Sequence, residues 1–413
     1  MNNDASGPSL NGDSARSSVR SVCWIDANLQ YRSPTTVHLL RALPHLREAG
    51  WQIEAWCLRS DAPHDQVRHV FLPAAKWLGP FELHWFVIIA NLYGVWRRLH
   101  TGVRTPTVIH ATSGTYLRAN VVTVHFVNAV WTAMQIKLGF HSAKEFAKFV
   151  LGLPGLLFDW LSWSSPTLRK ILTVSESMAA EIRKRAPAGR EIEVLPNSYD
   201  ETRFHPGVRS RYRDTTRAAL GLSPAETAFI FVSQGHYERK GFWLALDALS
   251  RLRKAGRHGL RLIVVGGTLA RLDSLRKRLD AEAADWRQWV LLAGIQREVE
   301  KYYAAADAFL FPSYYETYAL VAMEAAAVGL PLLITPFGGS EMTIRDGVNG
   351  LLLDYEPERM SAQIARFLDS GLPPFEPGAG RGLSRRQYAE RLLAIYERMV
   401  AGKMPIAAST ARP

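Results

Sequence analysis

The chain has the composition of an ordinary globular protein, with 47% hydrophobic and 21% charged residues. Its length of 413 residues is more than a single hydrophobic core usually supports, so we expect two domains. Its formal net charge of +12 indicates an acidic partner, whether nucleic acid, anionic lipid or a phosphorylated substrate. Because the basic residues are spread along the chain without an Arg/Lys tract or an RNA-binding signature, we expect no nucleic acid partner.

Short sequence patterns predict the cellular compartment of the protein and the flexibility of its two ends. Cys23 and Cys57 are the only cysteines and lie in apolar, strand-like runs, which is typical of core residues in a reducing compartment. Residues 1–18 lack the apolar run of a signal peptide, and like the tail 401–413 they are expected to be flexible. No stretch reaches the roughly 18 uninterrupted apolar residues of a spanning helix. We expect a cytoplasmic protein, either free or peripheral on the inner face of the membrane.

The first elements follow the order strand, loop, helix, strand. Residues 19–26 form a buried-strand pattern, a helix opens after the loop 27–34, and another strand follows at 51–58. Such βαβ units build doubly wound parallel sheets, in which ligands sit outside the carboxyl ends of the strands. Arg32 and Ser33 are therefore candidates for the acceptor side of a cleft, while a solvated loop charge is the alternative for Arg32.

Two apolar helical segments come next, at residues 77–98 and 140–169. Both combine bulky aromatic residues with lysine and arginine, a combination that suits a helix lying in a lipid interface. The alternative is a pair of core helices that cover the sheet. These segments are thus expected either to lie on an anionic membrane surface or to pack against the protein's own sheet.

A second strand, loop and helix begins at residue 229. The strand 229–233 is followed by the loop Gln-Gly-His-Tyr-Glu-Arg-Lys-Gly, which contains Gly235 and His236 and ends with Arg239, Lys240 and a glycine before the next helix. Two adjacent cations at such a turn would attract a diphosphate, because charge-assisted hydrogen bonds are strong. A solvated turn pair is the alternative.

The most informative stretch lies between residues 308 and 346. A strand at 308–311 is followed by a predicted helix over 317–328, with Glu316 just before it and Glu324 inside it. An ionised carboxylate accepts hydrogen bonds from vicinal hydroxyls. Two carboxylates around a helix start therefore suggest a ligand that carries hydroxyl groups.

The same helix start predicts an anion site. Thr317 is the expected N-cap, and the unpaired N–H groups of Tyr318, Ala319 and Leu320 would face the carboxyl ends of the strands. Backbone donors and the helix dipole both favour negative charge at such a position. A ligand with hydroxyls and phosphates, such as a nucleotide sugar, fits both features.

These residues resemble a known family. Glu316 and Glu324 are separated by seven residues, and the segment KYYAAADAFLFPSYYETYALVAMEAAAVGLPLLIT is similar to the E-x7-E region of retaining family 4 glycosyltransferases of the GT-B type. The resemblance implies an α/β fold of two Rossmann-like doubly wound domains facing a central cleft. The expected parts are an N-terminal acceptor-side domain, a linker, a C-terminal nucleotide-sugar-binding domain and a helix that packs back onto the first domain, at residues 19–200, 201–226, 227–383 and 384–400.

The resemblance also assigns roles on the donor side. Lys240 matches the lysine that binds the donor diphosphate, and His236 stands where an arginine is usual, so Arg239 is expected to supply the second charge. Gly294 and Ile295 resemble the loop that contacts the base. The family glycines near the helix start appear here as Thr317 and Ala319.

The resemblance implies three further roles nearer the sugar. Glu324 would bind the ribose hydroxyls, and Glu316 would bind the donor sugar or act as a nucleophile. His125 matches a strand-end histidine in the cleft near the donor sugar. A capping or core histidine is the alternative.

The expected function is retaining transfer of a hexose-type sugar from an NDP-sugar to a hydroxyl of a polysaccharide, lipid-linked or other glycan acceptor. The chain has no Asp-x-Asp, so we expect no metal and no cofactor, with positive charge supplied by the protein. It also lacks a GxGxxG after the first strand and a P-loop, which disfavours a dinucleotide oxidoreductase and a P-loop nucleotidase. A nucleotide-sugar epimerase or hydrolase of the same fold, or a catalytically silent binding protein, remains the alternative.

Overall fold

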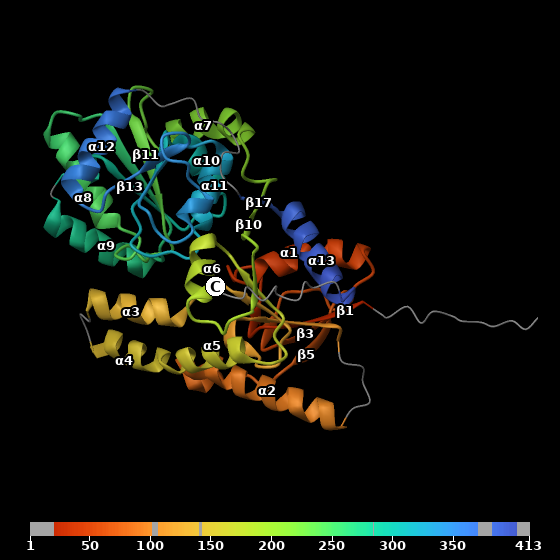
Figure 1. Ribbon diagram of the computed structural model, residues 1–413. Coiled ribbons are helices and arrows are strands. Elements are labelled where there is room, and N and C mark those ends of the chain that lie inside the picture. The colour runs from red at the N-terminus through yellow and green to blue at the C-terminus, as the bar shows by residue number, and fades with distance from the viewer. Residues whose placement is uncertain (1–19, 101–105, 140–142, 284, 371–381, 403–413) are drawn as a thin grey trace, which may run out of the picture.

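The computed structural model describes residues 20–100, 106–139, 143–283, 285–370 and 382–402 (Figure 1). The described chain forms two α/β domains, each built on a parallel sheet, with one domain above the other in this view. The predicted fold class is confirmed. The lead 1–18 and all but the first two residues of the tail 401–413 lie outside the described residues.

The N-terminal domain contains a seven-stranded parallel sheet with the order β5-β3-β1-β6-β7-β8-β9. Successive apolar residues of a strand point to opposite faces, and both faces of the sheet are buried. On β1, Val22 and Trp24 face one core, whereas Cys23 and Ile25 face the other. The strands are β1 (Ser21–Ile25), β3 (Gln52–Cys57), β5 (Arg68–Phe71), β6 (Val108–Thr112), β7 (Val121–Val124), β8 (Lys170–Thr173) and β9 (Glu191–Val194).

Helices cover both faces of this sheet. Helix α1 (Val37–Glu48) packs on the first face, and α2 (Glu82–His100), α5 (Pro154–Ser164) and α6 (Glu176–Arg183) contribute to the core on the second. The remaining elements of this half are β2 (Asn28–Leu29), β4 (Arg59–Ser60), η1 (Lys76–Phe81), η2 (Ser113–Thr115), α3 (Asn128–Leu138) and α4 (Ala143–Gly152).

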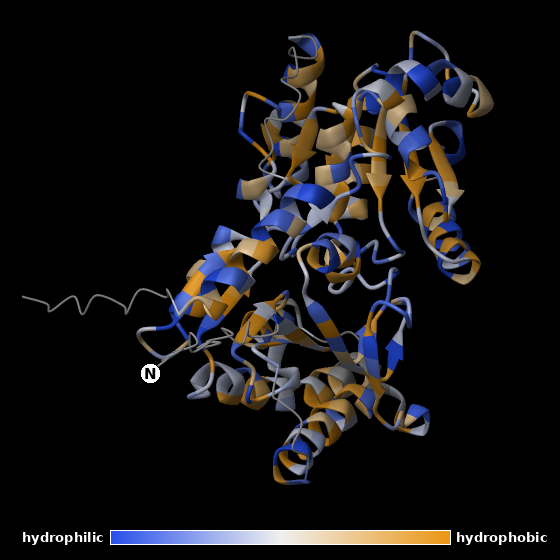
Figure 2. Ribbon diagram, turned by 90° about the vertical axis from the view of Figure 1, so that its right-hand side faces the viewer, coloured by the Kyte–Doolittle hydropathy of each residue, from blue (hydrophilic) through white to orange (hydrophobic). Residues whose placement is uncertain are grey.

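The C-terminal domain is a six-stranded parallel sheet with the order β13-β12-β11-β14-β15-β16. Its strands are mostly apolar and appear largely orange in Figure 2, as expected for a sheet covered on both faces. The strands are β11 (Thr227–Val232), β12 (Leu260–Val265), β13 (Val290–Gly294), β14 (Ala308–Phe311), β15 (Leu332–Ile334) and β16 (Gly350–Leu352). The helical elements are α7 (Gly207–Ala219), α8 (Phe242–Lys254), α9 (Leu269–Glu282), η3 (Trp286–Gln288), α10 (Val299–Ala305), α11 (Leu320–Val328), η4 (Ser340–Met342) and α12 (Pro357–Asp369).

The chain crosses between the domains twice, side by side. On the way out it forms β10 (Ser198–Tyr199), and on the way back β17 (Leu383–Ser384), which pairs with β10 in parallel. Helix α13 (Arg385–Val400) then packs against α1 on the N-terminal domain. The buried Tyr396 hydroxyl contacts Trp24 Nε1 at 3.1 Å and His110 Nδ1 at 2.6 Å, which ties the last helix to two strands of the first sheet.

The two apolar segments predicted from the sequence are helical. The first is η1 followed by α2. The second is α4 followed by α5, which ends at Ser164, and residues 140–142 of the predicted segment lie outside the described residues. Pro154 lies in the first turn of α5, where the backbone N–H that proline lacks would have no partner within the helix. Among the described residues, none of the helices combines the length and apolar character needed to cross a bilayer.

Tyr396→Phe is expected to lower the free energy of unfolding by about 1–3 kcal/mol, because it leaves Trp24 Nε1 and His110 Nδ1 buried without a partner. Urea unfolding would measure the loss. Tyr31→Phe, at a side chain that is 52% exposed, is the control and should change stability by less than about 0.5 kcal/mol. Equal stability of the two variants would contradict this account of α13.

Candidate active site

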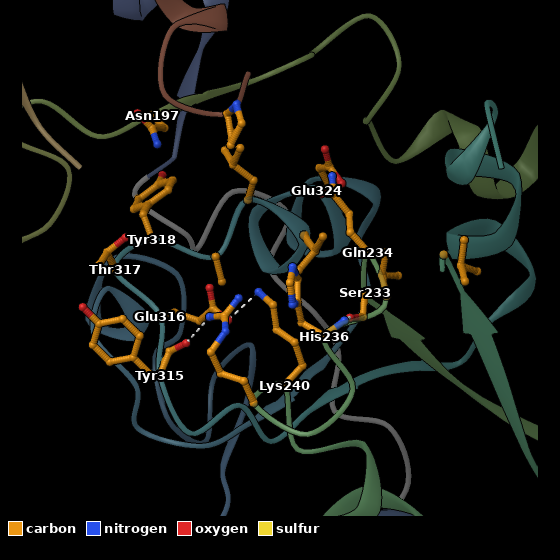
Figure 3. A pocket seen from close by; sticks show the side chains of 18 of the residues that line it. Asn197, Ser233, Gln234, His236, Lys240, Tyr315, Glu316, Thr317, Tyr318 and Glu324 are labelled. Atoms are coloured by element: carbon orange, nitrogen blue, oxygen red, sulfur yellow. Dashed lines mark hydrogen bonds and ion pairs between the residues drawn. The ribbon is translucent and has the colours of Figure 1, made fainter. Parts of the chain in front are cut away.

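A cavity of about 980 Å³ lies between the two domains, at the carboxyl ends of strands from both sheets (Figure 3). This is where doubly wound sheets bind ligands. The N-terminal domain and the chain just before the crossing contribute Pro34, Thr35, His125, Phe126, Trp131 and Asn197. The polar and charged residues from the C-terminal domain include Ser233, Gln234, His236, Arg239, Lys240, Thr268, Gln296, Tyr315, Glu316, Thr317, Tyr318 and Glu324.

Glu316 is the centre of an ionic cluster in this cavity. Its Oε1 atom accepts from Lys240 Nζ, from Arg239 Nη1 at 3.3 Å and from Ser313 Oγ at 2.9 Å. Arg239 also donates to the Tyr315 carbonyl at 2.7 Å. Figure 3 shows Lys240 and Tyr315 around the Glu316 carboxylate. The structure thus brings together the three charged residues singled out from two separate sequence motifs.

The charges in this cluster do not cancel. Burial lowers the pKa of Lys240, and the nearby Glu316 carboxylate opposes that shift. Two cations share a single carboxylate that is only 9% exposed. The cluster therefore has a net positive charge beside the cavity, which favours an anionic ligand.

Glycine geometry places Lys240 against Glu316. Gly241 has φ +74°, and a Cβ at this position would lie 1.9 Å from the carbonyl oxygen of Pro312. Only glycine allows the Lys240 turn to approach the loop after β14 this closely. Gly235 also has positive φ, at +87°, and the His236 amide after it donates to Ser233 Oγ at 3.1 Å.

Glu324 lines the same cavity from helix α11. Its Oε2 atom accepts from Tyr303 Oη at 3.2 Å. Burial raises the pKa of the Glu324 carboxyl to about 7, although Tyr303 and the more distant Arg203 and Arg41 lower it. A carboxyl group with this pKa is partly protonated near neutral pH and gains from a ligand that donates hydrogen bonds to it.

The predicted helix start is wrong by three residues. Helix α11 begins at Leu320, Ala319 is its N-cap without a side-chain cap, and the first helical amides belong to Leu320 and Val321. Thr317 does not cap the helix, since Ala319 is the N-cap, and the Thr317 carbonyl accepts from Ser175 Oγ of the other domain at 3.0 Å. Tertiary contact therefore holds residue 317 outside the helix, while Thr317, Tyr318 and Ala319 still line the cavity.

His125 follows β7 and lines the cavity from the opposite domain. Burial lowers the pKa of His125 to about 4, although a hydrogen bond to the Thr35 backbone opposes the shift. The imidazole is therefore neutral near pH 7. Burial also lowers the pKa of His236, with Arg239 adding to the effect, so neither histidine adds charge to the cavity.

Only some of the remaining predicted residues line the cavity. Ile295 lines the cavity, and Gly294 precedes it with φ +68°. Arg32 and Ser33 are not among the lining residues, whereas the next two residues are. Arg32 Nε instead lies 3.4 Å from the Gln30 side chain.

Sequence reasoning missed an aromatic wall of the cavity. The ring of Tyr315 lies 5.3 Å from Trp131 and 6.3 Å from Phe126, between centroids. It also missed Ser233 and Thr268, which follow β11 and β12 at their carboxyl ends. Position at a strand end is the signal that would have found these two residues.

Ser175 and Ser177, at the start of α6, join the domains directly. Besides the bond from Ser175 to Thr317, the Gly339 amide donates to Ser177 Oγ at 3.0 Å, and the Ser177 amide donates to Glu341 at 2.9 Å. A second cavity, of about 590 Å³, adjoins this contact and shares Tyr315, Glu316 and Thr317 with the first. Its other lining residues include Val127, Val130, Met134, Met178, Tyr314, Phe337 and Tyr355.

Two Rossmann-like domains facing a shared cavity define a GT-B architecture, and solved structures of that architecture superpose on the chain. WaaG, a glycosyltransferase involved in lipopolysaccharide biosynthesis, matches with a TM-score of 0.64 and 16% identity over 92% of this chain and 98% of WaaG. Anabaena HepE in complex with UDP-glucose matches with a TM-score of 0.58 and 16% identity over 92% and 98%.

Family models identify the chain more closely. Residues 35–203 match the model of Glycosyltransferase Family 4, and residues 226–370 match that of Glycosyl transferases group 1. The chain belongs to the family 4, group 1 type of GT-B glycosyltransferases, which confirms the resemblance inferred from sequence.

Curated relatives are named D-inositol 3-phosphate glycosyltransferase. The protein from Nocardia farcinica is 35% identical over 166 residues, which cover 39% of this chain and 36% of that protein. The protein from Mycobacterium marinum is 31% identical over 236 residues, which cover 53% and 47%. The matches thus span less than half the length of these relatives.

Glu324→Gln is expected to stabilise the protein at pH 8 by up to about 3 kcal/mol, because the pKa of Glu324 is raised from 4.5 to about 7 and the ionised form is disfavoured by burial. Between these pH values the folded state binds more protons than the unfolded state. The wild type therefore loses stability as pH rises from 4.5 to 7, and the variant does not.

Urea unfolding from pH 4.5 to 8 measures this difference. Glu358→Gln, at a side chain that is 65% exposed, is the matched control and should show no such trend. An equal stability difference at both ends of the range would rule out burial of the Glu324 charge as its cause.

Proposed function

We propose that the protein is a retaining, metal-independent glycosyltransferase that moves a hexose-type sugar from an NDP-sugar to an acceptor hydroxyl. The observation that carries this proposal is the Glu316–Lys240–Arg239 cluster beside the first turn of α11, inside the cavity between the domains. Fold membership supports transfer from a nucleotide sugar, and the HepE structures with UDP and UDP-glucose support a nucleotide diphosphate donor.

The cations and the helix start would bind the departing diphosphate. Lys240 and Arg239 supply charge, and the amides of Leu320 and Val321 supply backbone donors at the positive end of α11. During transfer the bond from the anomeric carbon to the diphosphate oxygen breaks and a bond to the acceptor oxygen forms. The acceptor proton leaves with the diphosphate, so the reaction balances without a cofactor.

The two carboxylates would hold the rings on either side of the diphosphate. Glu324 would bind the ribose hydroxyls and Glu316 the hydroxyls of the donor sugar. A carboxylate already paired with two cations and Ser313 is a weak nucleophile. We therefore infer that Glu316 positions the sugar rather than forming a covalent intermediate. His125, which is neutral, would contact the sugar from the other domain.

The acceptor would enter from the second cavity, which meets the first at Glu316. Its lining by Val127, Val130, Met134 and Phe337 suits an acceptor with an apolar portion, such as a lipid-linked sugar. The inositol phosphate named in the relatives supports a phosphorylated acceptor as well. A lipid-linked acceptor would place the protein on the inner face of the membrane, in cell-surface polysaccharide assembly.

Glu316→Gln is expected to reduce transfer by more than about 100-fold, because the sugar loses its charged acceptor. Binding of the free nucleoside diphosphate should be retained or become tighter, since Lys240 and Arg239 are released from the carboxylate. Lys240→Met should instead weaken diphosphate binding by about 10-fold or more. Calorimetry and a transfer assay measure the two effects, with Glu358→Gln as control.

Near-normal turnover by Glu316→Gln would contradict the proposed role of this residue in sugar transfer. If the wild type binds a donor but neither transfers nor hydrolyses it, the protein is a nucleotide-sugar-binding protein and not a transferase.

A panel of UDP-, GDP- and ADP-sugars is expected to contain one donor that raises the melting temperature, because a ligand that binds only the folded state stabilises it. Thermal-shift measurements in EDTA test both whether a donor binds and whether its binding is independent of a metal. If the shift requires added Mg²⁺, the proposed metal independence is wrong.

A further inference from the structure

Helix α2 is apolar on two opposite faces. Phe86, Val87, Ala90 and Gly94 are buried against the sheet. On the other side, at helical spacing, lies an exposed stripe formed by Ile88, Leu92, Val95, Trp96 and Leu99. Leu92 is 63% and Leu99 is 75% exposed. A surface helix normally presents polar residues to water, so this stripe lacks the pattern expected for a solvent-facing surface.

Neighbouring elements extend the stripe. Helices α2 and α5 lie side by side, with the rings of His84 and Phe158 at 6.0 Å, and Figure 1 shows α2, α4 and α5 at the bottom of the view, on the side away from the C-terminal domain. Figure 2 shows orange on the helices at the bottom of that view. We call this the apolar face, made up of Trp77 and Phe81 of η1, the α2 stripe, Phe146 and Val150 of α4, and Leu157 and Trp160 of α5.

A cationic cavity of about 530 Å³ lies at the carboxyl end of α2, beside Trp96 and Leu99 in the chain. Four arginines line it. Arg97 is paired with Glu54. Arg98, Arg118 and Arg169 have no ion pair or side-chain hydrogen bond within the described part of the chain, so three guanidinium groups surround one small space without a counter-charge.

This cavity is remote from the proposed donor site. Arg118 precedes β7, and Arg169 precedes β8. Pro106, which precedes β6, also lines the cavity. Because all strands of the sheet are parallel, their amino ends lie at the edge opposite the cleft between the domains. An anion bound here cannot be the donor diphosphate.

We propose that the apolar face docks on an anionic phospholipid bilayer and that Arg98, Arg118 and Arg169 bind the phosphate of a lipid headgroup. Arginine forms bidentate bonds with phosphate. Exposed aliphatic and tryptophan side chains next to cations suit the boundary between headgroups and acyl chains. A second copy of this chain fits the apolar face less well, because it would bring another cluster of unpaired arginines and no anion to bind the first cluster.

The inference deepens the membrane attachment included in the proposed function, yet it does not depend on sugar transfer. Binding is measured without donor, so the failure of one proposal is distinguishable from the failure of the other.

Flotation with vesicles of phosphatidylcholine alone, or with 30% phosphatidylglycerol, tests the proposal. The wild-type chain is expected to float with the anionic vesicles. R98Q/R118Q/R169Q should reduce binding at least about 10-fold. The matched control R183Q/R345Q/R391Q removes the same charge from exposed arginines that lack ion pairs within the described chain, and it should still bind.

The apolar face is tested separately. L92S/W96S/L99S should lose binding to the anionic vesicles, and Leu269→Ser, at a side chain that is 79% exposed on the C-terminal domain, should not. Circular dichroism checks folding of every variant.

Equal binding by the two triple-arginine variants, or no binding by the wild type, would overturn the proposal. So would a melting-temperature rise with inorganic phosphate that depends on the three arginines while vesicles remain unbound. That result would identify a soluble phosphate ligand instead of a bilayer.

Discussion

The arrangement of the cleft depends on one carboxylate shared by two cations. Glu316 is almost completely buried, and a buried charge persists only when it is paired and hydrogen-bonded. Lys240 and Arg239 provide that pairing from the turn before α8, and Ser313 completes it from the loop after β14. Because these groups come from different loops, the ionic cluster also fixes those loops relative to each other.

Backbone geometry makes this pairing available. Gly241 brings the cationic turn against the carbonyl of Pro312, and β11 and β14 are adjacent strands whose following loops meet at the same edge. The N-terminal domain closes the other side through Ser175 and Ser177. The order of the strands thus determines where the cavity lies, and the side chains of the following loops line it.

Much of the fold and part of the site could be predicted from sequence. Alternating strand and helix patterns indicated doubly wound sheets, and the spacing of Glu316 and Glu324 predicted that both carboxylates face one ligand. These features are local, or they follow from rules for parallel sheets.

The features that could not be predicted depend on contacts between distant segments. Thr317 is kept out of α11 by Ser175, which is more than a hundred residues earlier in the chain. The aromatic wall around Tyr315 combines residues from both domains. Arg98, Arg118 and Arg169 look like solvated charges until the topology brings three separate elements to one edge of the sheet.

Helix α13 has a consequence for how the polypeptide acquires its structure during synthesis. The first domain lacks part of the helical layer on one face of its sheet until Tyr396 and its neighbours leave the ribosome, by which time the second domain has emerged. Until then α1 is the helix that covers this face of the N-terminal sheet, and the place of α13 beside it is empty. The N-terminal domain is therefore completed only when Arg385–Val400 has been synthesised, after the whole C-terminal domain.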